Sequence, residues 1–339
     1  MKQRLRLLVG IAVSLSCFYL AMRLIDWRQL WEVYRGASYS YLVPALVLLV
    51  LISWARAYRW RLLMYPNQQL PLSRLFAIVN IGYLFNNIMP AKAGELVRGY
   101  LVGRMVPGGI AQVLSTLLVE RLLDVLTLVL LLIGLIPFVA LPGWATKAGL
   151  LFGSVSVSGA IVLVVLAKFG DRGVDWAWRL MQRLPLVGHP KAKAALQNLL
   201  IGFRVLTVGR LLPGIVLWSL LIWLGYALFN YILIAAFGMT YLPPFAAAVV
   251  LCATGFSMVV PSSPGAFGPF EGAAVLALGI YGVGDSQAFG YAFGLHAFTN
   301  IALILLGLWG LRGESLTFSG IRRRALTQDT SSAATEEPA

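Results

Sequence analysis

Charged side chains are scarce in this chain: they form 12% of its 339 residues, about half the share found in a soluble globular domain. Hydrophobic residues form 59%, and the mean hydropathy is +0.82. Several apolar runs reach roughly 18 residues, long enough to cross about 30 Å of hydrocarbon as a helix. The composition therefore excludes a soluble enzyme, a secreted disulfide scaffold and a disordered chain. The runs are continuous, so they also lack the alternating pattern of a transmembrane β-barrel.

Acidic residues, cysteines and histidines are few as well. The 13 Asp and Glu residues face 27 Lys and Arg residues, which gives a net charge of +14. In a soluble protein this excess would suggest nucleic acid. In a membrane protein, basic loops set the orientation and meet anionic headgroups, so we expect no nucleic-acid partner. Cys17, Cys252, His189 and His296 are too few for a disulfide framework or a histidine-based metal site. We expect no metal and no cofactor.

The apolar segments predict an all-α polytopic membrane protein with about eight hydrophobic segments. About six of them are expected to be full spans, and two to be re-entrant hairpins with broken helices. Each hairpin begins with an apolar half-helix, at about 72–89 before Pro90 and at about 243–260 before Pro261. The expected full spans end at about residue 24 or lie at about 41–54, 110–136, 148–167, 211–237 and 287–311.

Loop charges predict the orientation. Basic residues concentrate at the N-terminus, in the connection 168–210, and in the tail from Arg312 onward. The positive-inside rule places these parts, and both termini, in the cytoplasm of a bacterial inner-membrane protein. We expect one transmembrane domain over 1–315 and a largely disordered cytoplasmic tail over 316–339. One set of apolar residues in the connection has helical spacing, which fits a helix lying on the membrane or on the protein's own inner face: Leu196, Leu199, Leu200, Phe203 and Leu206.

The two broken segments resemble each other. Each begins with Leu-Pro, continues as an apolar half-helix and ends in Pro-x-x-x-Gly, at Pro90 to Gly94 and at Pro261 to Gly265. Proline ends a helix, and glycine permits backbone shapes closed to other residues. Irregular backbone survives at membrane depth only where protein buries it or water reaches it. A matching pair of interrupted segments indicates a transporter site built from inverted repeats, although chance similarity remains an alternative. Pro264 and Gly268 extend the second break.

Charged residues interrupt the apolar helices. Glu120, Arg121 and Asp124 fall on one helix face at 100° per residue, and a charge at the bilayer centre is costly, so this face should point inward. Glu95 and Arg98 follow the first break. One interpretation is a central polar cavity, with arginines for a lipid phosphate and acids for a cationic headgroup or a proton. The other is that Arg121–Asp124 and Glu95–Arg98 are internal ion pairs.

Further polar residues near the breaks fit the same two interpretations. Lys92 would either attract phosphate or extend to the interface, and Glu271 would serve the cavity or a long-range pair. His296 is expected to be a satisfied core residue, with a proton relay as the alternative. The side chains of one group would bind headgroup oxygens or satisfy freed backbone groups: Asn86, Asn87, Ser262 and Ser263.

These residues carry a resemblance to a known family. Three motifs occur in order: Asn87-x-x-Pro90-x-x-x-Gly94-Glu95-x-x-Arg98, then Glu120-Arg121-x-x-Asp124, then Pro261-x-x-Pro264-Gly265-x-x-Gly268-x-x-Glu271. Together they resemble the lysylphosphatidylglycerol synthase transmembrane region, also described as the flippase-like domain family, over roughly residues 5 to 315. Some members form the membrane half of the multiple peptide resistance factor, and others stand alone. The resemblance implies lipid translocation or a supporting role in lipid trafficking. It implies no synthase activity, because the aminoacyl-transferase domain of the two-part members is absent here.

Three functions fit the sequence. The first is a flippase-like transporter that moves a phospholipid or a lipid-linked (glyco)lipid, anionic or polyprenyl-linked, between leaflets. No P-loop motif is present, so either a gradient drives the movement, with Glu95 or Glu271 as sites of protonation, or the movement is passive. The second is a non-catalytic partner of a lipid-synthesising enzyme or a glycosyltransferase. The third, a lipid-modifying enzyme, is disfavoured because no catalytic constellation is recognisable; we expect a protein that is not an enzyme.

Overall fold

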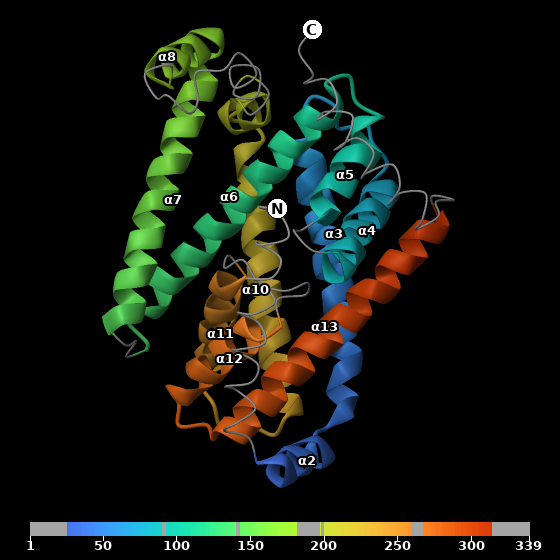
Figure 1. Ribbon diagram of the computed structural model, residues 1–339, viewed down its shortest axis with the longest axis vertical. Coiled ribbons are helices and arrows are strands. Elements are labelled where there is room, and N and C mark those ends of the chain that lie inside the picture. The colour runs from blue at the N-terminus through green and yellow to red at the C-terminus, as the bar shows by residue number, and fades with distance from the viewer. Residues whose placement is uncertain are drawn as a thin grey trace, which may run out of the picture. The chain divides into compact units, whose positions relative to one another are not determined.

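All regular structure that the computed structural model describes is helical (Figure 1). The described residues are 26–89, 93–139, 143–181, 197, 200–258 and 267–313. The all-α polytopic prediction is therefore confirmed. Several predicted features lie outside the described residues: the first span, the tail 316–339, and Pro90, Lys92, Pro261, Ser262, Ser263, Pro264 and Gly265.

The described helices follow the apolar runs closely. Three stretches are long and apolar enough to cross a membrane: Tyr39–Leu63, Leu212–Ala236 and Asp285–Gly313. Helix α6 has 27 residues but carries three charges near its middle, and the number of full crossings stays a prediction. The bounds are α2 Trp27–Gly36, α3 Leu42–Leu63, α4 Leu72–Ile88, α5 Ala93–Gly103, α6 Gly109–Leu135, α7 Gly143–Phe169, α8 Asp171–Met181, α10 Leu212–Ala236, α11 Pro244–Ser257, α12 Pro269–Gly279 and α13 Asp285–Gly313, with short 3₁₀ helices at Tyr39–Tyr41 and Arg204–Thr207.

The chain divides into two compact units. Within the described residues, unit 1 takes 26–55, 121–160 and 216–302, and unit 2 takes 56–120, 161–215 and 303–313. The boundaries fall inside α3, α6, α7, α10 and α13. Each broken segment belongs to one unit: α4 and α5 pack together in unit 2, and α11 and α12 in unit 1. The predicted single domain and the inverted relation between the hairpins stay predictions.

The two hairpins have similar proportions. The second helix has 11 residues in both, while the first has 17 in α4 and 14 in α11. Helix α4 ends at Ile88, two residues before Pro90, and α11 ends at Ser257, before Pro261. Because proline lacks the N–H that would continue a helix, the positions of both breaks follow from the sequence. Both predicted half-helices are confirmed.

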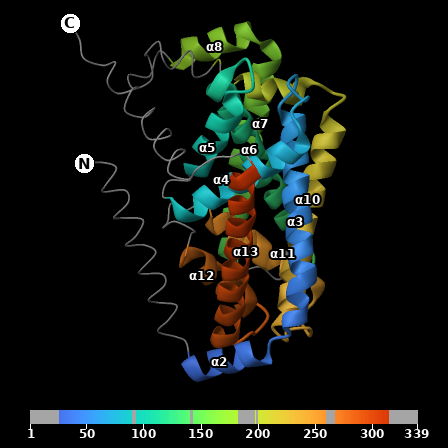
Figure 2. The same cartoon turned by 90° about the vertical axis from the view of Figure 1, so that its right-hand side faces the viewer.

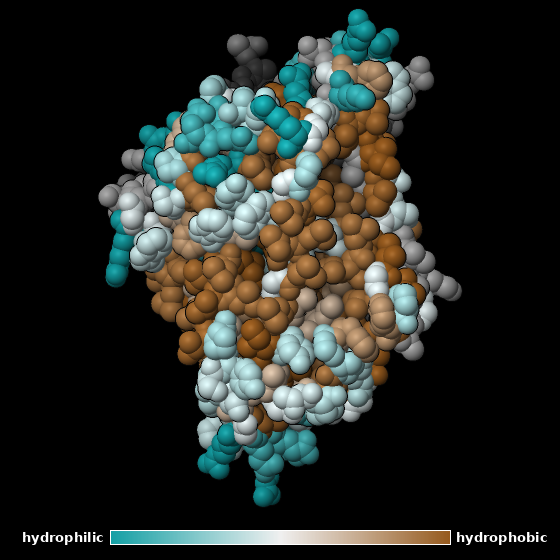
Figure 3. All heavy atoms as spheres, turned by 180° about the vertical axis from the view of Figure 1, so that it is seen from behind, coloured by the Kyte–Doolittle hydropathy of each residue, from teal (hydrophilic) through white to brown (hydrophobic). Residues whose placement is uncertain are grey.

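Small residues bring the helices of each unit close together. In unit 1, a Cβ added at Gly255 would lie 2.9 Å from the side chain of Leu128. In unit 2, a Cβ at Gly310 of α13 would lie 2.9 Å from the carbonyl oxygen of Ala77 on α4. Lipid tails are as apolar as leucine, so close van der Waals packing takes over much of the role that apolar burial has in water. Large apolar side chains remain exposed along helices such as α3 and α10, as expected for surfaces that meet lipid (Figure 3).

Helix α2 is a short amphipathic element that the apolar runs did not reveal (Figure 2). Asp26 caps it by accepting the backbone N–H of Arg28 at 2.9 Å. The Tyr34 hydroxyl donates to the Gly290 carbonyl at 3.0 Å and so ties α2 to α13. Burial raises the pKa of Tyr34 to about 12, which keeps this hydroxyl a donor.

The basic connection 168–210 is partly described. Of its predicted apolar face, Leu200 and Phe203 are buried, and a Cβ added at Gly202 would lie 2.5 Å from the hydroxyl of Ser115 in unit 2. This part of the face therefore packs on the protein, which was one of the two expected arrangements. Leu196 and Leu199 lie outside the described residues.

Candidate functional site

The first hairpin closes through a side chain and two glycines. The Oδ1 atom of Asn86, near the end of α4, accepts the backbone N–H of Gly94 at 2.9 Å. Asn86 thus satisfies a backbone donor near the helix start, as one of the two interpretations expected. A Cβ on Gly94 would collide with the carbonyl oxygen of Gly82. The backbones of α4 and α5 therefore touch, which places the first turns of α5 directly against α4.

Arg98 extends from α5 into the interior of unit 2. Its aliphatic carbons pass over Gly82, where an added Cβ would lie 2.7 Å from Cδ. Its guanidinium carbon lies 4.1 Å from the centroid of the Trp60 ring, a cation–π distance. The Trp60 Nε1–H donates to Thr116 Oγ1 at 3.1 Å, which fixes the ring. Arg98 is only 3% exposed, so the glycine and the ring together define its path.

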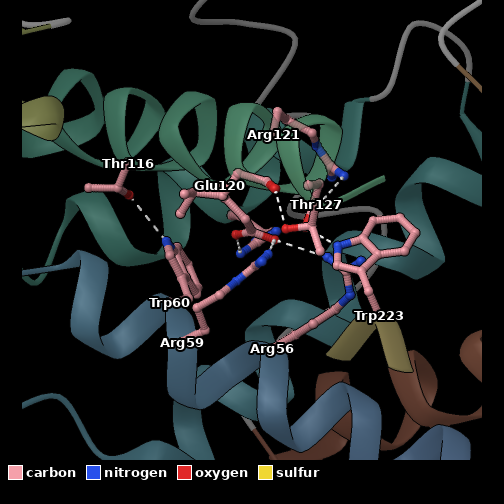
Figure 4. A network of polar contacts seen from close by, with 11 residues as sticks. Arg56, Arg59, Trp60, Thr116, Glu120, Arg121, Thr127 and Trp223 are labelled. Atoms are coloured by element: carbon pink, nitrogen blue, oxygen red, sulfur yellow. Dashed lines mark hydrogen bonds and ion pairs between the residues drawn. The ribbon is translucent and has the colours of Figure 1, made fainter. Parts of the chain in front are cut away.

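Glu120 of α6 is the carboxylate on which three arginines converge (Figure 4). Arg98 Nη2 donates to Glu120 Oε2 at 2.8 Å. Arg56 Nη1 lies 3.5 Å and Arg59 Nη2 lies 3.9 Å from Glu120 Oε1, both from α3. All four side chains are at most 6% exposed. We call these four residues, with Trp60 and Thr116, the Glu120 cluster.

The Glu120 cluster corrects one sequence interpretation. The span expected at about 41–54 is too short, because α3 continues to Leu63 and buries Arg56 and Arg59. Their spacing of three residues puts them on one helix face, and Trp60 is adjacent. This spacing was the sequence signal for a shared buried face. It was easily overlooked, because basic residues at the end of a membrane span usually lie at the interface with water.

The other charged residues of α6 belong to unit 1. Arg121 Nη1 lies 3.6 Å from Asp124 Oδ2, which confirms the predicted ion pair. The Trp223 Nε1–H donates to Asp124 Oδ1 at 3.2 Å. The prediction of one inward face holds for Glu120 and Asp124. Arg121 is a partial exception, because its side chain is 37% exposed and lies at the edge of that face.

The second hairpin holds a carboxylate–imidazole pair. Gly268 caps α12 with φ of 94°, a conformation that glycine adopts readily, and its N–H donates to Glu271 Oε2 at 2.6 Å. Glu271 Oε1 lies 2.6 Å from His296 Nδ1 on α13. Phe267 and Phe270 lie against the imidazole, with centroids at 4.5 and 4.3 Å. We call these five residues the Glu271 cluster.

The Glu271 cluster confirms one expectation and corrects another. A long-range pair was one of the expected roles of Glu271, and His296 provides it. His296 was expected to be a satisfied core residue, yet its buried Nε2 has no hydrogen-bond partner within the described ranges. Glu95 and Asn87 are half-buried at the first hairpin. The two clusters lie in different units, so the predicted single cavity stays a prediction.

The described residues offer no group of three His, Cys, Asp or Glu side chains placed to hold a metal ion. These residues contain a buried guanidinium–carboxylate cluster and a buried imidazole–carboxylate pair. Each lies in a unit that holds one of the two broken segments, and the surrounding helices are apolar. These features define a polytopic α-helical membrane protein with buried charged sites.

Comparison with known proteins identifies the family of this chain. Residues 7–307 match the family described as the lysylphosphatidylglycerol synthase TM region, and the chain belongs to this family. A UPF0104 membrane protein of Methanothermobacter thermautotrophicus is 24% identical over 308 residues, which cover 84% of this chain and 87% of that protein. No solved structure matches the chain. The resemblance drawn from the three motifs is confirmed.

Proposed function

We propose that this protein moves a phosphate-bearing lipid headgroup between membrane leaflets and that Arg98 in the Glu120 cluster contacts the phosphate. The observation that carries the proposal is the convergence of three buried arginines on Glu120, in the same unit as a broken helix. Buried charges in membrane helices are costly and persist where they serve a substrate path or a partner.

The chemistry of Arg98 suits a phosphate. A guanidinium carries five N–H donors in a planar fork that matches phosphate oxygens. Glu120 accepts a hydrogen bond from Nη2, and the buried Nε of Arg98 has no hydrogen-bond partner in the part of the chain that the structure describes. Glu120 stabilises the guanidinium when no lipid is bound, and Trp60 holds its plane. A headgroup phosphate would compete with Glu120 for the same donors, which permits both binding and release.

The family assignment supports a lipid as the substrate class. Its description names lysylphosphatidylglycerol synthase, whose product is a phospholipid. We infer a cytoplasmic-membrane location and an anionic phospholipid or polyprenyl-linked lipid as cargo.

Reconstituted vesicles containing a fluorescent phosphatidylglycerol, quenched from outside, would test the proposal. We expect Arg98→Gln to lower the initial rate of lipid movement at least tenfold, and Arg98→Lys, which keeps charge but loses the fork, to lower it several-fold. Arg28→Gln is the matched control, because Arg28 is exposed on α2 and pairs only with Glu32 at 3.7 Å among the described residues. Movement at the unmodified rate in a folded Arg98→Gln protein would refute the proposal, as would chemical conversion of the lipid without movement.

A further inference from the structure

We propose that Glu271 and His296 form a proton-binding site that takes up one proton at the Nε2 atom of His296. Its use in driving lipid movement rests on the proposed function, whereas proton binding itself does not. The two side chains are 0% and 2% exposed and meet at 2.6 Å. Nothing in the transport chemistry assigned to Arg98 requires this pair.

The surroundings of Glu271 favour its ionised form. One oxygen accepts the Gly268 N–H at 2.6 Å at the N-terminus of α12, where the helix dipole stabilises negative charge. The other oxygen faces His296 Nδ1. An ionised carboxylate can only accept, so Nδ1 carries a hydrogen and donates it. In the neutral imidazole, Nε2 is then left with a free lone pair.

That lone pair is the acceptor for the incoming proton. Nε2 is buried and has no hydrogen-bond partner among the described residues, which makes it an unsatisfied group in the described pair. When Nε2 takes a proton from water, the imidazole becomes an imidazolium, and the net charge of the pair changes from −1 to zero. The carboxylate at 2.6 Å compensates the new positive charge.

Two aromatic rings also favour the charged imidazole. Phe267 and Phe270 lie 4.5 and 4.3 Å from the His296 ring centroid, at interplanar angles of 33° and 28°. Aromatic faces attract cations within about 6 Å.

Few other titratable groups can interfere. Helix α11 carries no charged residue, Glu271 is the only one in α12, and the stretch 258–268 between them has no titratable side chain. On α13, the nearest titratable neighbour in sequence is Tyr291, whose hydroxyl donates to Asn230 at 2.9 Å. On α6, Arg121 and Asp124 pair with each other. His296 is therefore the titratable partner of Glu271 within the described part of unit 1.

The small number of histidines makes the test direct. The full chain has two, His189 and His296, so nuclear magnetic resonance of histidine-labelled protein in nanodiscs gives two ring signals. His189→Gln assigns the signal of His296. We expect that signal to report uptake of one proton, and Glu271→Gln to weaken proton binding at least tenfold.

The substitution Glu271→Gln is conservative because its amide oxygen can still accept the Gly268 N–H. Glu32→Gln, at an exposed position on α2, is the control and should leave the titration unchanged. A His296 signal that stays constant with pH, or that titrates identically in folded Glu271→Gln protein, would overturn the proton site. Lipid movement that fails in unmodified protein while His296 titrates as expected would instead refute the proposed function.

Discussion

Arg98 and Glu120 are 22 positions apart in the sequence, yet their side chains meet at 2.8 Å in the interior of unit 2. The contact depends on the missing side chain at Gly82, over which Arg98 passes. Placing a guanidinium and a carboxylate in a membrane bundle carries a desolvation cost, which only good geometry and further hydrogen bonds offset. The pair is therefore a point at which close helix packing and a buried ion pair constrain the same residues.

Replacing Gly82 by alanine should displace Arg98. The new Cβ would lie 2.7 Å from Cδ of Arg98, and overpacking of this kind costs about 1–3 kcal/mol. We expect a lower midpoint of thermal unfolding in detergent and slower lipid movement. Gly272→Ala is the matched control, because no atom lies within 4 Å of its added Cβ. Equal stability of the two variants would argue against close packing at Gly82.

Neutralising the shared carboxylate should be more severe. Glu120→Gln removes the charge approached by Arg56, Arg59 and Arg98, and breaking a buried ion pair costs about 3–5 kcal/mol. Equilibrium unfolding in mixed micelles measures the change. Glu32→Gln breaks an exposed pair on α2, for which about 0.5 kcal/mol is expected. A loss for Glu120→Gln as small as that of the control would contradict the cluster.

The role of Thr116 in holding the Trp60 ring, over which Arg98 lies, can be tested. Thr116→Val keeps the side-chain shape but leaves the buried Trp60 Nε1–H without its acceptor at 3.1 Å, which costs about 1–3 kcal/mol. Thr299→Val provides a comparison, because the one described acceptor of the Thr299 hydroxyl is the Leu295 carbonyl of its own helix. We expect the first variant to lose unfolding free energy and the second to change little; the reverse order would show that Thr116 does not hold the ring.

The tie between α2 and α13 predicts a dependence on alkaline pH. Tyr34→Phe removes the donor to the Gly290 carbonyl, at a cost of about 1 kcal/mol. Burial raises the pKa of Tyr34 from 10.0 to about 12, so its contribution is fully present below pH 10 and is lost as the pH rises through 12. The difference in unfolding free energy between the two proteins should be constant from pH 6 to 10 and should shrink above it. A difference that grows with pH would contradict the assignment.

The sequence predicted the long apolar helices well, because hydrocarbon enforces long, continuous apolar runs. The segment expected at about 110–136 is Gly109–Leu135, and the segment expected at about 211–237 is Leu212–Ala236. Helix α2 was missed because its ten residues form an amphipathic pattern without an apolar run.

The sequence predicted the buried charged residues of the candidate sites but not their partners. Sequence reasoning selected Arg98, Glu120 and Glu271, since charges inside apolar helices are conspicuous. Their partners came from other helices: the pairs Arg98–Glu120 and Glu271–His296 span 22 and 25 positions. Such pairing follows from how helices pack in space, which local periodicity does not encode.

The backbone contact between Gly82 and Gly94 has a mechanical consequence. With no side chains between them, and with Asn86 holding the Gly94 amide, α4 and α5 cannot slide or spread without breaking this junction. Any motion that opens a route past Arg98 must therefore move α4 and α5 together as one rigid body, with the hinge away from the glycines.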